Sequence, residues 1–129
     1  MTQEKRVIQE VLSAQSASDG AGVRLKRVFG GRNLGRFDPF LMLDEFGSFD
    51  AADYVGGFPS HPHRGFETVT YMLEGYMEHR DHMDNLGRLG PGDVQWMNAG
   101  SGVIHSEMPQ QKEDRKSTRL NSSHRCISY

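Results

Sequence analysis

The chain has 129 residues, with 15 basic and 17 acidic side chains, one cysteine and a net charge of −2. This length suits one ordinary domain, and the small net charge argues against a disordered polyelectrolyte. The longest purely apolar run, at 40–43, is far shorter than the roughly 20 residues that cross a membrane, and a single cysteine cannot form an internal disulfide. No apolar segment follows the charged start, so we expect no secretory signal and a cytoplasmic protein, or a nuclear one in a eukaryote, without a membrane or direct nucleic-acid partner.

Fifteen glycines and five prolines are spread along the chain, which is typical of an all-β sandwich or small barrel with many turns. The expected strands share alternating, β-branched or aromatic residues. In chain order they are 7–12, 23–29, 40–43, 66–73, 76–80, 94–97 and 103–107. We expect turns or loops between them, including 13–22, 30–33 and 98–102, with an acidic corner at Asp44-Glu45 and no strong helix.

The charge changes sign near residue 111. Residues 1–111 carry 10 basic and 15 acidic side chains, whereas residues 112–129 carry 5 basic and 2 acidic ones. The end of the chain has no apolar period, and from Arg115 onward it resembles a translated sequencing-adapter read-through; a basic interaction tail is the alternative. We therefore predict a domain over 1–111 and a non-native or disordered tail over 112–129.

Two pairs of residues stand out as candidate ligands: His61 with His63, and His105 with Glu107. Residues i and i+2 of an extended chain point to the same face, so each pair offers two ligand atoms from one strand. Two such strands facing each other across a barrel would bring three imidazoles and one carboxylate together. Pro62 cannot donate a ladder hydrogen bond, which places the first pair on an edge strand.

Either pair alone is more typical of solvated or packed polar residues than of a site, but four buried polar groups without a partner would be costly. Three histidines and a carboxylate form a ligand set for a first-row transition metal. The predicted domain holds no cysteine, which argues against a thiolate zinc site. Ferrous iron suits nitrogen and oxygen ligands with open positions, whereas manganese, nickel, copper and zinc stay open as alternatives.

Other polar and aromatic residues have weaker patterns. Glu67 lies four residues after His63, so on a straight strand it would share that face as a hydrogen-bond partner of an imidazole, as a fifth ligand, or as a surface carboxylate. His79 and His82 flank a polar stretch, which favours a solvated turn. Trp96 is expected in the core.

Four segments resemble the N-terminal half of the pirins, a family of two-domain cupins. They are DPFLMLDEF (38–46), HPHRGFETVTY (61–71), PGDVQWM (91–97) and GVIHSEMP (102–109). The resemblance covers about residues 5–110 and implies a cupin β-barrel (a jelly roll) that binds iron through His61, His63, His105 and Glu107. It also implies a second cupin domain, which is missing from this sequence.

The resemblance implies two functions. Bacterial pirins are often quercetin 2,3-dioxygenases, so we expect a flavonol-like aromatic substrate, dioxygen as co-substrate, and Glu107 as a catalytic base that takes the substrate's hydroxyl proton. Animal pirins are iron-dependent co-regulators of transcription factors. The alternative is therefore a non-enzymatic, redox-sensing module that binds a protein partner.

Overall fold

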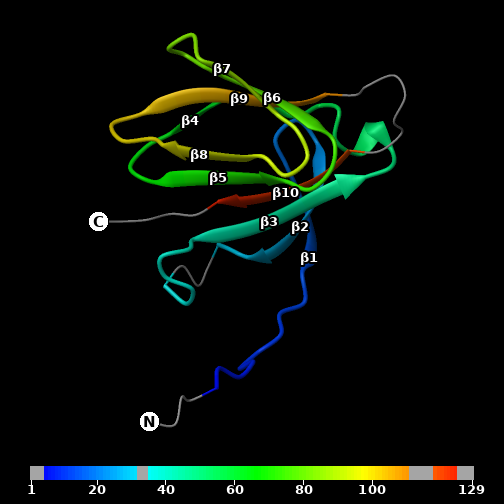
Figure 1. Cartoon of the computed structure of the whole chain (residues 1–129), viewed down its shortest axis with the longest axis vertical. Helices are drawn as coiled ribbons and strands as arrows, with labels where there is room; N and C mark the ends of the chain where they lie inside the picture. The colour runs from blue at the N-terminus through cyan, green and yellow to red at the C-terminus, as the bar shows by residue number, and fades with distance from the viewer. Residues whose placement is uncertain (1–4, 32–34, 111–117, 125–129) are drawn as a thin grey trace.

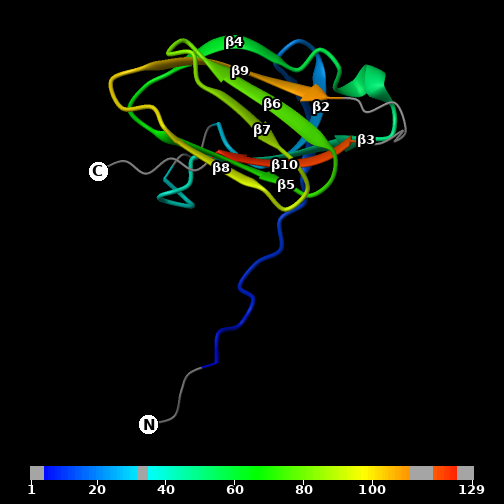
Figure 2. The same cartoon turned by 45° about the horizontal axis from the view of Figure 1, so that its top comes forward.

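Two antiparallel sheets face each other and form a flattened barrel (Figures 1 and 2). The computed structural model describes residues 5–31 and 35–110, together with the backbone of 118–124. The six-stranded sheet has the order β1-β2-β3-β10-β5-β8, and the four-stranded sheet has the order β4-β9-β6-β7. The strands are β1 (Gln15–Asp19), β2 (Val23–Phe29), β3 (Met42–Ser48), β4 (Phe58–His63), β5 (Glu67–Met72), β6 (Tyr76–Asp81), β7 (Leu86–Leu89), β8 (Val94–Asn98), β9 (Val103–Gln110) and β10 (Thr118–His124).

The all-β prediction is confirmed, and most of the expected strands from residue 23 onward form with small shifts at their ends, whereas the strand expected at 40–43 is displaced to Met42–Ser48. The strand expected at 7–12 is wrong. That segment extends away from the barrel without secondary structure (Figure 1), and Val7, Ile8 and Val11 are exposed. The first strand is instead β1, within the segment expected to be a turn. It forms because the turn at Gly20–Gly22 returns the chain so that Asp19 pairs with Val23, and this pairing outweighs the weak apolar pattern of its sequence.

The acidic corner expected at Asp44-Glu45 is also wrong, because β3 continues through both residues. Asp44 is buried on the inner face and lies opposite Arg27 of β2 in the strand register. Its two carboxylate oxygens accept hydrogen bonds from Nε and Nη2 of Arg27, each at 2.8 Å. A bidentate, charge-assisted pair allows a strand to carry a buried carboxylate.

Besides β1, the strands β7 and β10 were not expected from the sequence. β7 forms a hairpin with β6. The backbone of β10 lies between β3 and β5 in the six-stranded sheet, although residues 112–129 were expected to lie outside the fold. The boundary at residue 111 stays a prediction.

The hydrophobic core lies between the two sheets. Its buried members come from both sheets and from the loop before β4: Val23, Leu25, Phe46, Tyr54, Met72, Met77 and Leu89. The helical segment in the described residues is the three-residue 3-10 turn Ala51–Asp53, and no described helix is long and apolar enough to span a bilayer.

We expect Asp44→Asn to lower the free energy of unfolding by about 2 kcal/mol, because it removes a charge-assisted, bidentate interaction from a buried position. The loss should be smaller than for a fully buried ion pair, since the Arg27 side chain is 31% exposed. Denaturant unfolding measures the difference, with Glu74→Gln in an exposed turn as the control. Equal stabilities of the two variants would contradict this account of β3.

Candidate metal centre

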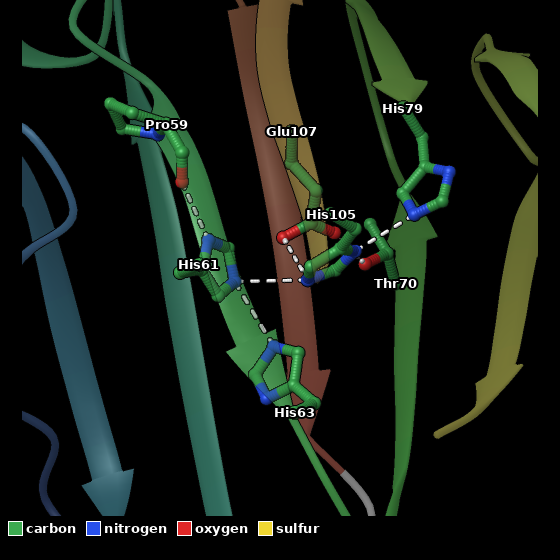
Figure 3. A network of polar contacts seen from close by, with 7 residues as sticks. All are labelled: Pro59, His61, His63, Thr70, His79, His105 and Glu107. Carbon is green, nitrogen blue, oxygen red and sulfur yellow. Dashed lines mark hydrogen bonds and ion pairs between the residues drawn. The ribbon is translucent and has the colours of Figure 1, made fainter. Parts of the chain in front are cut away.

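The two ligand pairs predicted from the sequence lie on neighbouring strands. β4 and β9 are antiparallel partners, and His61 is directly opposite His105 in their register. β4 is an edge strand, as the presence of Pro62 predicted. Figure 3 shows His61, His63, His105 and Glu107 gathered in one place.

The relative position of these two strands differs from the one expected from the sequence. We expected the two strands to face each other across the barrel, but they belong to the same sheet. Directly opposed residues of an antiparallel pair have their Cβ atoms only about 5 Å apart, so lateral pairing brings the imidazoles into contact without the two sheets having to converge.

Three ring nitrogens meet at the centre of the cluster. Nε2 of His61 lies 3.0 Å from Nε2 of His63 and 2.9 Å from Nε2 of His105. The ligand atoms of these three residues all lie within 4.8 Å of one another. Nδ1 of His61 donates to the carbonyl oxygen of Pro59 at 2.8 Å; because a carbonyl can only accept, Nε2 of His61 keeps its lone pair for the cluster.

The spacing of these nitrogens fits a bound metal ion. Two nitrogen ligands at about 2.1 Å from one ion, at about a right angle, are about 3.0 Å apart. Lone pairs on nitrogens this close repel one another unless a proton or a cation lies between them. The donor set therefore fits a divalent transition metal.

Glu107 supplies a buried carboxylate beside the imidazoles, with a residue exposure of 5%. One of its oxygens lies 4.0 Å from Nε2 of His105, and the other accepts a hydrogen bond of 3.1 Å from the hydroxyl of Thr70 on β5. Burial raises the pKa of Glu107, although the Thr70 hydroxyl and His61 oppose this shift. A carboxyl of this kind takes up a proton more readily than an exposed one.

His79 is a residue of this site that the sequence analysis missed. We expected a solvated turn, but His79 lies on β6 with a residue exposure of 5%, and its Nε2 is 2.7 Å from Nδ1 of His105 (Figure 3). Burial lowers the pKa of His79 and so favours the neutral imidazole. The signal was available, since 76–80 was expected to be a strand and alternation places His79 on the same face as the core residue Met77.

The other predictions for polar and aromatic residues have mixed outcomes. His82 lies in an exposed turn, as expected. The premise for Glu67 is wrong, because β4 ends at His63 and β5 begins at Glu67 in the other sheet. The oxygens of Glu67 accept hydrogen bonds from Trp96 and Asn98 of β8, and its role beside an imidazole stays a prediction. Trp96 is not in the core, since it is 53% exposed.

A cavity of about 650 Å³ opens onto the cluster. His61, His63 and Glu107 are among the residues that line it. Apolar side chains form much of the remaining wall: Leu41, Met42, Phe58, Pro59 and Phe66. A mostly apolar cavity of this size with a few converging polar groups is typical of a small-molecule site.

Residues 22–121 match the family model described as Pirin. Over 108 residues the chain is 65% identical to a Pseudomonas aeruginosa protein named "Putative quercetin 2,3-dioxygenase", covering 84% of this chain and 38% of that protein. It is 49% identical over 114 residues to the pirin of Rattus norvegicus, covering 88% of this chain and 38% of that protein. The chain thus spans about two fifths of the length of these relatives.

Solved structures show the same relationship. A quercetin 2,3-dioxygenase from Acinetobacter baumannii superposes with a TM-score of 0.72 at 32% identity, covering 91% of this chain and 42% of that one. A bacterial pirin from Escherichia coli in complex with nickel(II) gives 0.61 at 27%, covering 84% and 46%. A cupin from Shewanella frigidimarina gives 0.53 at 16%, covering 97% and 93%, which confirms the cupin fold alone.

We expect the metal-free wild-type protein to lose stability relative to Glu107→Gln as the pH rises. Because folding raises the pKa of Glu107, the folded state keeps a proton that the unfolded chain releases. The free energy of unfolding therefore falls as the pH climbs from the unfolded pKa, about 4.3, through the raised folded pKa, and is then constant.

Denaturant titrations of the metal-free proteins between about pH 4 and about pH 8 measure this difference. Glu74→Gln, in an exposed turn, should keep the wild-type profile. Parallel profiles for wild type and Glu107→Gln would refute the effect of burial on this carboxyl.

Proposed function

Because the chain belongs to the pirin family, we propose that it is an iron-binding cupin of the quercetin 2,3-dioxygenase type. The observation that carries the proposal is the convergence of three Nε2 atoms beside a buried carboxylate, at the wall of a largely apolar cavity. Since the chain spans 38% of its relatives' length, the proposal includes its place as the N-terminal cupin, over 1–111, of a two-cupin protein.

The proposed ligands are His61, His63, His105 and Glu107. Nitrogen and oxygen ligands without a thiolate suit ferrous iron, and the nickel complex of the Escherichia coli pirin supports a site that accepts other divalent ions. When bound, the ion would supply Lewis-acid activation of the substrate hydroxyl and the redox chemistry that dioxygen requires.

The residues of the chain would bind the substrate and move one proton. The apolar wall of the cavity would hold the flavonol rings and exclude water, with the hydroxyl and carbonyl oxygens toward the imidazoles. Glu107, whose burial raises its pKa, would take the hydroxyl proton as general base. The overall reaction adds both atoms of dioxygen to the flavonol and releases one ring carbon as carbon monoxide.

Metal removal tests this proposal directly. We expect chelated protein to consume no quercetin and release no carbon monoxide, and anaerobic reloading with Fe²⁺ to restore both. His61→Ala should reduce turnover at least about 100-fold, because the loss of a ligand costs more than the loss of a residue that only supports one. His82→Asn, in an exposed turn outside the cluster, is the matched control; unchanged turnover after chelation would reject the oxygenase.

The alternative function, a redox-sensing module that binds a protein partner, is favoured by a different observation. The outer face of β5 and β8 exposes Tyr71, Val94 and Trp96 at 43%, 55% and 53%, and exposed apolar patches of this kind mark interaction sites. Anaerobic addition of quercetin to the Fe²⁺ protein separates the two functions. A changed iron spectrum supports the oxygenase, whereas an unchanged spectrum with partner affinity that follows the iron oxidation state supports the module.

A further inference from the structure

We propose that His79 is a positioning residue that fixes the ring orientation and the tautomer of His105, so that Nε2 of His105 is available as a ligand. This inference rests on the proposed metal centre and adds a residue that the predicted ligand set does not contain. It is carried by one buried contact, the 2.7 Å separation between Nε2 of His79 and Nδ1 of His105.

The contact lies on the side of His105 away from the other imidazoles. Nε2 of His105 lies 2.9 Å from Nε2 of His61, whereas Nδ1 of His105 faces His79 (Figure 3). The His105 ring thus separates His79 from the centre of the cluster, and His79 would support a ligand without being one.

The hydrogen bond determines which nitrogen of His105 carries the hydrogen. If Nδ1 of His105 donates to His79, then Nε2 of His105 keeps its lone pair and points it into the cluster. If His79 were the donor, the hydrogen of a neutral His105 would lie on Nε2 and would occupy the position of a metal. Histidines that bind a metal through one nitrogen commonly donate the N–H of the other nitrogen to a nearby acceptor. This hydrogen bond both orients the ring and makes the ligand more basic.

Burial makes this contact costly to lose. His105 and His79 have residue exposures of 1% and 5%, so water cannot readily replace either partner, and an unpaired buried polar group costs free energy. In the register of β6 and β9, His79 is opposite Glu107, which makes it a diagonal neighbour of His105. The sheet therefore holds the two rings at a fixed spacing.

His61 and Glu107 also have hydrogen-bond partners outside the cluster. Nδ1 of His61 donates to the carbonyl of Pro59, and Glu107 accepts from the hydroxyl of Thr70. The support of His61 comes from the backbone, whereas His79 supports His105 through a side chain. The role of His79 can therefore be tested by substitution.

Two substitutions of similar size separate hydrogen bonding from packing. His79→Leu fills the space but cannot accept a hydrogen bond, whereas the amide oxygen of His79→Gln can accept from Nδ1 of His105. We expect His79→Leu to weaken Ni²⁺ binding by the 129-residue chain about 10- to 100-fold, and His79→Gln to restore most of the affinity. Calorimetric titration of the metal-free proteins with Ni²⁺ measures both.

A spectroscopic measurement tests the tautomer itself and does not depend on whether a variant folds. Nitrogen-15 spectra of the wild-type protein loaded with diamagnetic Zn²⁺ should show His105 with its hydrogen on Nδ1 and His79 with its hydrogen on the nitrogen away from His105. A hydrogen on Nε2 of His79, which would make His79 the donor to His105, would overturn the inference, as would Ni²⁺ affinities of His79→Leu and wild type that are equal.

The failure of this inference differs from the failure of the proposed metal centre. If the wild type binds Ni²⁺ and His61→Ala does not, the centre stands, and equal binding by His79→Leu then overturns the role of His79 alone. If the wild type binds no Ni²⁺, or if His61→Ala binds it as well as the wild type, the centre itself is refuted and the role of His79 with it.

Discussion

The antiparallel pairing of β4 with β9 is the constraint on which the candidate centre depends. This register sets His61 against His105, and alternation along the two strands adds His63 and Glu107 to the group. A shift of β4 by one residue would turn His61 and His63 to the face opposite His105 and Glu107. The geometry of the cluster is therefore set by the backbone pairing of β4 with β9.

The remainder of the barrel stabilises this arrangement by supplying partners for its buried polar groups. Met72 and Met77 belong to the hydrophobic core between the two sheets, and Thr70 reaches from the six-stranded sheet to Glu107 of the other. Each buried polar group in the cluster thus meets a partner from a different strand. A polar site whose carboxylate and one imidazole are buried and held from several strands has little freedom to rearrange, as a centre that binds a metal in one geometry requires.

The cavity and the cluster share residues, so a molecule bound in the cavity would lie next to the potential metal ligands. His61, His63 and Glu107 lie both in the group of potential ligands and in the cavity wall. A molecule in the apolar part of the cavity would therefore lie beside the imidazoles and the carboxylate. The support from His79 lies behind this wall, which allows it to act on His105 without obstructing access.

The sequence alone determined that the chain is all-β, that most of the central strands lie where they do, and that His61, His63, His105 and Glu107 form two same-face pairs, because alternation and turn residues are local properties. It could not determine that the two pairs are lateral neighbours, that His79 is buried against His105, or that β1 replaces the strand expected at 7–12. Those outcomes depend on which strands pair and in which register. The premise for Glu67 failed for the same reason. Its spacing from His63 predicts a shared face only if both residues lie on one continuous strand, but the turn at Gly65 places them in different sheets.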